Sequence, residues 1–377
     1  MEKRINLRDF SMLIALILIA AYFYTRDPRF LSSRNLAQLG IELSATAVLG
    51  LGMLLVILPG HIDLSVGSGV GLIGAIAAVL IVNSDWSALP ALGLTSLLSV
   101  AIYAAMGFII IKERVPAFII TLGGLLVFKG AHWLVIASQT VPVAPGGEEN
   151  LYSRLTTYYL PAALGYALGA VCIAALGFFM WRGHQRRASR GFVADGELIF
   201  LRWFLSSQVV FLFVLVMNQY KGVPLAALLL GLVALLVHVL LQQTRLGRYL
   251  YAIGGNEAAA VVAGVPVKSV VIGAFALMGV IVALAGFLQT AFGGATTTTT
   301  GQLMELDAIA ACVIGGTSLK GGQGSVVGVL FGALIMAMLL NGMTLLAVSP
   351  ENKFIARGLV LALAVWMDVR LSRERTA

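Results

Sequence analysis

The chain is 377 residues long, 59% of its residues are hydrophobic and 11% are charged, and its formal net charge is +8. This composition lies far outside the range of soluble domains. The positive charge does not indicate a nucleic-acid partner, because the lysines and arginines gather in short segments between apolar runs, where they orient a protein in its bilayer. We therefore predict an all-α, polytopic integral membrane protein, since lipid offers a spanning backbone no hydrogen-bond partners.

Twelve apolar runs follow one another, and a bilayer core of about 30 Å needs about 20 such residues in a helix. The runs cover residues 10–25, 35–58, 64–83, 88–111, 116–136, 159–181, 198–218, 223–243, 269–291, 303–319, 323–346 and 354–369. The tenth run holds Gly315-Gly316-Thr317-Ser318, which predicts a broken or re-entrant helix. No linker is long enough for a soluble domain, so we expect one membrane domain over residues 1–377.

The distribution of basic residues gives the orientation. With the N-terminus in the cytoplasm, most lysines and arginines fall on the cytoplasmic side, as the positive-inside rule requires. Both termini are then cytoplasmic. Arg26, Arg29 and Arg34 go against this orientation.

Residues 244–268 form a polar, glycine-punctuated segment between two apolar runs. Asn256 is a favourable N-cap residue, the Glu257 carboxylate suits the positive end of a helix, and Gly264 can end a helix before Pro266. These signals predict a short helix that starts after Asn256 and stops before Gly264.

The middle of this short helix, residues 258–263, is small and apolar. On the cytoplasmic surface it would expose a smooth knob suited to a cleft on a partner protein. The alternative is a loop helix that packs against its own bundle.

Four separated motifs carry a family resemblance. The segment from Gly247 to Ala259 resembles the EAA-type coupling segment of carbohydrate-import ABC permeases of the ribose and xylose type. Residues 62–68, 115–123 and 305–319 agree with the same family in the expected order, so the resemblance extends from about residue 35 to residue 369. It implies the monosaccharide-translocating subunit of an importer in the bacterial cytoplasmic membrane, working as a homodimer with a cytoplasmic ATPase and a periplasmic sugar-binding protein.

The resemblance also assigns the residues that contact the ATPase. They are Gly254, Gly255, Asn256, Glu257, Ala258, Ala259 and Gly264. The chain lacks the Gly-x-x-x-x-Gly-Lys-Ser/Thr loop that cradles nucleotide phosphates, so ATP and Mg²⁺ are expected in a separate ATPase subunit. We expect no cofactor in this chain and no metal site, because its histidines and two cysteines are scattered.

Residues 159–218 are an insertion relative to ribose-type permeases and supply two extra spans. This longer architecture resembles the xylose-type members of the family, which makes D-xylose the expected sugar. Another pentose or hexose is the alternative within the same family.

Hydroxyl-bearing and glycine-rich breaks are candidates for the translocation path, because freed backbone groups and hydroxyls suit a neutral polyol. They are Asp63, Ser65, Ser68, Gly315, Gly316, Thr317 and Ser318. The alternative role is structural, as caps of the following helices.

Charged residues within the spans leave a second class of function open. An ion-coupled secondary sugar transporter would need titratable groups near the midplane, and Glu42 is the clear candidate. We interpret Lys129 as a residue that snorkels to the interface, and His132 as a packing residue. The threonine run of residues 296–300 is expected on the outer face, where a sugar-binding protein would dock.

Overall fold

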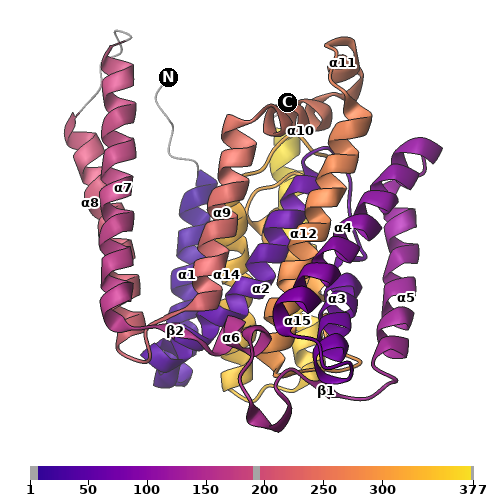
Figure 1. Ribbon diagram of the computed structural model, residues 1–377. Helices are drawn as coiled ribbons and strands as arrows, with labels where there is room; N and C mark the ends of the chain where they lie inside the picture. The colour runs from indigo at the N-terminus through magenta and orange to yellow at the C-terminus, as the bar shows by residue number, and fades with distance from the viewer. Residues whose placement is uncertain (1–6, 190–195, 375–377) are drawn as a thin grey trace.

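The computed structural model describes residues 7–189 and 196–374 of the chain (Figure 1). All twelve predicted spans are present as helices, which confirms the all-α polytopic fold. The helices are α1 (Leu7–Arg26), α2 (Ser33–Ile57), α3 (Val66–Val82), α4 (Ala88–Glu113), α5 (Ala117–Val135), α7 (Ala162–Ala188), α8 (Gly196–Asn218), α9 (Leu225–Gln243), α12 (Val267–Gly293), α13 (Met304–Ile314), α14 (Val326–Leu345) and α15 (Pro350–Glu374). Residues 1–6 and 375–377 lie outside the described residues, so the cytoplasmic position of the termini stays a prediction.

Short elements close the two ends of the bundle. They are the 3-10 turns η1 (Pro28–Leu31) and η2 (Pro145–Gly147), the helices α6 (Leu151–Thr157), α10 (Arg245–Gly255) and α11 (Glu257–Val262), and the strand pairs β1 (Val141–Pro142) with β4 (Ala295–Thr296) and β2 (Tyr159–Leu160) with β3 (Val223–Pro224). Helices α10 and α11 lie at the upper end of Figure 1, and α6, β1 and β2 lie at the lower end. We use upper end and lower end for the two ends of the bundle in this view.

Helices α2 and α12 form the centre of the bundle. Both are apolar on all sides and mostly buried, as expected of helices surrounded by other helices. Close packing between α12 and α4 depends on Gly279, whose added Cβ would lie 2.7 Å from the Ser99 carbonyl oxygen. The Ser99 hydroxyl in turn donates to the Gly279 carbonyl at 2.7 Å. In a bilayer the hydrophobic effect contributes little to association between helices. Close packing at glycine and a hydrogen bond from serine therefore stabilise the contact between α12 and α4.

The tenth span is broken, as the glycines predict. Helix α13 has 11 residues, and a helix of this length covers about 16 Å, roughly half of the bilayer core. Residues 315–325 continue without helical structure towards the upper end, with Gly316 at φ +93°. The Gly322 amide donates to the Leu58 carbonyl at 2.9 Å, which fixes this turn beside the end of α2.

Helices α7 and α8 are the two spans supplied by the insertion. They pack on each other and stand apart from the rest of the bundle at the left of Figure 1. Most of their residues are exposed in the chain as it stands. Val214 and Met217 join α8 to Ala37 of α2 at the lower end, where β2 pairs with β3.

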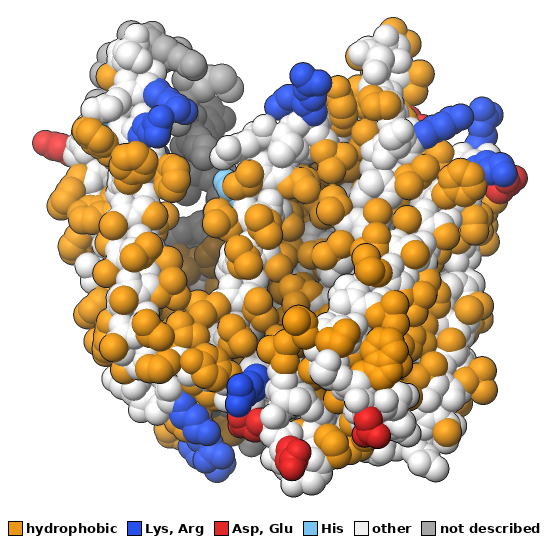
Figure 2. Space-filling model, in the orientation of Figure 1, with side chains coloured by type: hydrophobic (Ala, Val, Ile, Leu, Met, Phe, Trp, Pro, Cys, Tyr) orange, Lys and Arg blue, Asp and Glu red, His pale blue; other side chains and the backbone are white. Residues whose placement is uncertain are grey.

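The surface agrees with a bilayer environment. Figure 2 shows hydrophobic side chains over the flank of the bundle and charged side chains near its two ends. Eight helices of the described residues are long and apolar enough to cross a membrane, and two more apolar helices are shorter. The chain is therefore a multi-pass membrane protein.

Candidate functional site

The predicted short helix in residues 244–268 is present as α11, and its caps are the predicted ones. The Asn256 side chain accepts a hydrogen bond from the Ala259 amide at 2.9 Å. Gly264 has φ +80°, a conformation that glycine adopts without strain, and it ends the helix. A separate helix, α10, precedes α11 and begins at Thr244, whose hydroxyl accepts from the Gly247 amide.

The outer face of α11 is free. Val262 is 90% exposed and Val261 is 57% exposed, whereas Ala260 is the buried residue of the helix. Ala258 and Ala259 are also exposed. In this chain α11 therefore rests on the bundle through Ala260 and presents a small apolar surface at the upper end.

Helix α10 anchors this surface to the broken span. Gly254 packs against the Leu58 carbonyl and against Gly321 and Gly322 so closely that an added Cβ would overlap them. The Tyr251 hydroxyl donates to the Gly324 carbonyl at 2.9 Å. A displacement of α10 would consequently reach both the end of α2 and the turn that completes the tenth span.

A groove of about 840 Å³ lies beside α11 at the upper end. Its walls come from the α4–α5 turn, from α11 and from the start of α12, with His61 beside them. Arg114 and Lys268 supply positive charge and Glu257 supplies negative charge. Burial lowers the pKa of His61, which lies in the connection between α2 and α3.

Packing and hydrogen bonds differ among the seven residues predicted to line the path. Asp63 and Ser65 are fully buried, where the Asp63 carboxylate accepts from the Ser65 amide at 2.8 Å and from its hydroxyl at 2.6 Å. This arrangement shapes the turn before α3. Gly315 packs against Gly328 of α14, and Thr317 is buried. Ser68 lines a cavity of the lower half.

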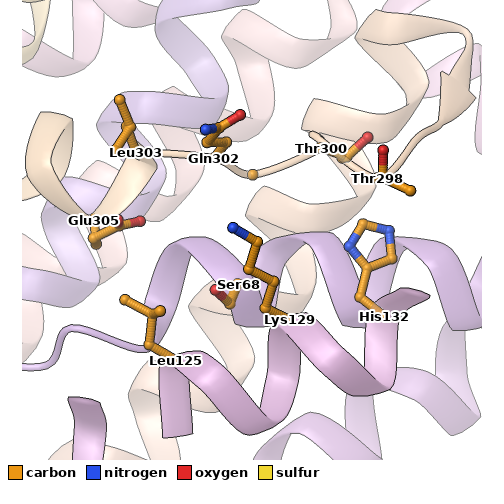
Figure 3. Close-up of a pocket in the computed structure, with 10 residues that line it drawn as sticks. Ser68, Leu125, Lys129, His132, Thr298, Thr300, Gln302, Leu303 and Glu305 are labelled. Carbon is orange, nitrogen blue, oxygen red and sulfur yellow. The ribbon is translucent and has the colours of Figure 1, made fainter. Parts of the chain in front are cut away.

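We name this cavity the outer cavity, because the sequence predicts that this end of the bundle faces outwards. Its volume is about 180 Å³. It lies between α3, α5 and the segment that joins α12 to α13 (Figure 3). Its lining residues are Ser68, Leu125, Lys129, His132, Thr298, Thr300, Gly301, Gln302, Leu303 and Glu305. Most of them carry a polar or charged side chain.

Lys129 lines the outer cavity, a position that the sequence interpretation did not include. Its ammonium group points into the outer cavity, and Glu305 lies on the opposite wall (Figure 3). His132 also lines the cavity, and its Nε2 lies 3.1 Å from the Thr296 hydroxyl. Sequence reasoning missed Glu305 as a cavity residue, although a carboxylate in an apolar run is itself a signal of function.

Two further carboxylates, those of Asp307 and Glu42, lie within the bundle near Arg357. Arg357 of α15 and Asp307 of α13 form an ion pair with 3.1 Å between Nε and Oδ1. The Asn341 amide donates to the Glu42 carboxylate at 3.5 Å, which is a weak contact, and the charges of Asp307 and Arg357 also act on Glu42. No group of three or more metal-ligating side chains occurs in residues 7–189 and 196–374.

Comparison with known proteins relates the chain to transport permeases. A family model described as "Branched-chain amino acid transport system / permease component" matches residues 35–365. The xylose transport system permease protein of Escherichia coli strain K12 is 39% identical over 374 residues, which cover 99% of this chain and 94% of that protein. The Haemophilus influenzae protein of the same name is 39% identical, covering 97% of each chain.

The ribose import permease protein of Escherichia coli strain K12 is 36% identical over 362 residues, covering 96% of this chain and 94% of that protein. No solved structure matches the chain. The family model spans most of the chain, and these relatives align with it nearly end to end. The chain therefore belongs to the branched-chain amino acid transport system permease family, and within it to the ribose- and xylose-type ABC permeases.

Proposed function

We propose that this chain translocates a monosaccharide, D-xylose, across the bacterial cytoplasmic membrane as the permease of an ATP-driven importer. ATP and Mg²⁺ act in a separate cytoplasmic ATPase, and a periplasmic binding protein delivers the sugar. Each chain carries one coupling segment, so two copies of the chain engage two copies of the ATPase. Two of the relatives described above are named for xylose transport and one for ribose import, which supports a pentose as substrate.

The observation that carries the proposal is the exposed apolar face of α11. A helix capped at both ends and seated on the bundle through α10 is rigid enough to transmit a displacement. Its free face, with Val262 90% exposed, is suited to a cleft on a partner. A partner that hydrolyses ATP can bias the permease between two states only if its contacts with this face differ between them. The upper end then faces the cytoplasm.

Substitution of Ala259 tests the docking role. Ala259→Arg places bulk and charge on the exposed face and is expected to abolish co-purification of the ATPase while the membrane domain stays folded. Ala259→Ser keeps the side chain small and serves as the matched control. Unchanged co-purification of the ATPase with Ala259→Arg would contradict the proposal.

Transport by the reconstituted system tests the energy source and the sugar. We expect ATP-dependent uptake of D-xylose into liposomes that contain this chain, the ATPase and the binding protein, with weaker competition by D-ribose. Uptake by this chain alone, driven by a proton or sodium gradient, would instead establish an ion-coupled secondary transporter. Preference for D-ribose would still indicate an ATP-driven sugar importer, but with D-ribose as its substrate.

A further inference from the structure

The outer cavity has the chemistry of a binding site for a neutral polyol. Serine and threonine hydroxyls, a carboxamide, an imidazole, an ammonium and a carboxylate surround it, while Leu125 and Leu303 are its apolar side chains. The hydroxyls can donate and accept, the carboxamide offers both functions, and the charged pair adds strong donors and acceptors. More of the wall surface is apolar than polar, with the polar groups distributed among apolar ones. A monosaccharide presents C–H faces as well as hydroxyls, so a wall of this mixed kind suits it.

The volume of the outer cavity is suited to one sugar ring. Its volume of about 180 Å³ corresponds to roughly six water molecules at about 30 Å³ each. That space admits a single sugar ring together with little water, and it excludes a disaccharide unless the walls move. The cavity lies between helices of the bundle, a common place for small-molecule sites.

The two charges of the cavity face each other without pairing. Lys129 comes from α5 and Glu305 from the first turn of α13, and no ion pair within 4.0 Å joins them in the described part of the chain. The Lys129 Nζ lies 5.8 Å from the ring centroid of Trp133, one turn further along α5, at the distance of a cation–π contact. One positive and one negative charge balance, so the cavity favours a ligand without net charge.

The wall opposite α5 is held in place before any ligand arrives. The Thr300 hydroxyl accepts from the Thr297 amide at 2.9 Å. The Trp133 indole donates to the Thr298 carbonyl at 3.1 Å, and His132 contacts the Thr296 hydroxyl. The threonine run is thus folded against α5 rather than extended outwards, and its hydroxyls are oriented in advance, which lowers the entropic cost of binding.

Glycines allow this wall to approach α3. A Cβ on Gly71 would lie 2.5 Å from the Thr300 carbonyl oxygen and 2.8 Å from His132 Nδ1. Gly301 has φ +81° and packs against the Gly67 carbonyl. Side chains at these positions would push the threonine run away from α3, so the cavity exists because these residues are glycine.

From this geometry we infer that the outer cavity is a transient binding station for one neutral monosaccharide, with Lys129 and Glu305 as hydrogen-bond partners of its hydroxyls. The inference rests on the proposed function and adds the place in this chain where the sugar is recognised. The station binds at millimolar concentration, because a tight site on a transport path would hinder release.

Cysteine protection tests the station directly. Thr298→Cys is placed in a Cys172→Ser background, since Cys172 is exposed and Cys312 is buried. We expect millimolar D-xylose to slow the labelling of this cysteine by a small thiol reagent, whereas L-leucine and a sugar acid do not. Thr299→Cys is the matched control, because the neighbouring Thr299 is exposed and does not line the cavity; its labelling should not respond to sugar.

Substitution of the charged pair completes the test. Glu305→Gln and Lys129→Met, each combined with Thr298→Cys, should shift the protecting D-xylose concentration upwards by about tenfold, since each removes one hydrogen bond to a charged group. Lys112→Met at the far end of α4 should not shift it. Circular dichroism and co-purification of the ATPase establish that each variant is folded.

The outcomes separate this inference from the proposed function. ATP-driven D-xylose uptake without protection at position 298 would overturn the station and leave the importer intact. Protection by L-leucine in place of D-xylose would overturn the sugar class of the cavity. Absence of any sugar uptake by the complete reconstituted system would overturn the proposed function itself.

Discussion

The Arg357 guanidinium and the Asp307 carboxylate form an ion pair inside the bundle, with their side chains 21% and 4% exposed. This pair joins α15 to the short helix α13, which cannot span the membrane alone. Because α13 ends at Ile314 and continues as an irregular turn, its position depends on such lateral contacts. The pair therefore fixes one of the walls of the outer cavity.

Breaking this pair should destabilise the fold. Arg357→Gln leaves the Asp307 carboxylate buried without a counter-charge, and loss of one partner of a buried pair costs about 3–5 kcal/mol. We expect a lower midpoint of thermal unfolding in detergent, with part of the loss recovered in Asp307→Asn/Arg357→Gln. Arg370→Gln, on the same helix but exposed, is the control. An unaltered midpoint for Arg357→Gln would show that the pair is dispensable.

Substitution by alanine should affect stability differently at the two adjacent glycines of α10, Gly254 and Gly255. Gly254→Ala forces a methyl group into the Leu58 carbonyl and the 321–322 turn, and overpacking of this kind costs about 1–3 kcal/mol. No atom lies within 4 Å of a Cβ on Gly255, so Gly255→Ala should be neutral or slightly stabilising. Thermal unfolding and ATPase co-purification measure both variants. Equal effects of the two substitutions would show that the close packing at Gly254 does not position α10.

The cap of α11 should matter for coupling more than for folding. Asn256→Ala removes the acceptor for the Ala259 amide, which costs about 1 kcal/mol in a helix of only six residues. We expect α11 to fray and the affinity for the ATPase to fall by roughly fivefold, the equivalent of that energy. Asn256→Asp retains an acceptor oxygen and should restore binding. The measurement is titration of the purified permease with the ATPase.

Helices α7 and α8 should be removable as a unit. Leu160 pairs with Val223 in the β2–β3 ladder, so the ends of the insertion are already adjacent. Replacement of residues 161–222 by Asn-Gly, which favours a two-residue hairpin turn, should leave the remaining bundle folded and able to bind the ATPase. Size-exclusion chromatography and ATPase co-purification check this outcome. Aggregation of the shortened chain would indicate that the pair supports the core.

The features that the sequence predicted correctly are those encoded locally. Apolar length predicted all twelve helices, and the cap residues Asn256 and Gly264 predicted α11, because hydropathy and capping act within a few residues. The outer cavity was not predicted. Lys129 and Glu305 are far apart in the chain, and their proximity follows from the packing of α5 and α13 around glycines of α3.

For Asp63 and Ser65, the sequence left two roles open. Asp63 and Ser65 combine a carboxylate and a hydroxyl in a break between spans, which suits either a path or a turn. In the structure they bond to each other in a fully buried turn, and Ser65 also lies 3.4 Å from the Tyr103 hydroxyl. Burial of this segment depends on α4 and α5, so it cannot be predicted from the segment itself. Their place on the path stays a prediction.

Helix α5 connects the two hollow regions of the molecule. Its first residue, Ala117, lines the groove beside α11, and Lys129 and His132 line the outer cavity further along. The helix packs chiefly against α3 and makes few contacts with α4. A straight helix of 19 residues is about 28 Å long. If the helix tilts as a rigid unit, a small displacement at the Ala117 end would reposition the Lys129 ammonium, so a change in the groove beside α11 could reach the outer cavity through α5 alone.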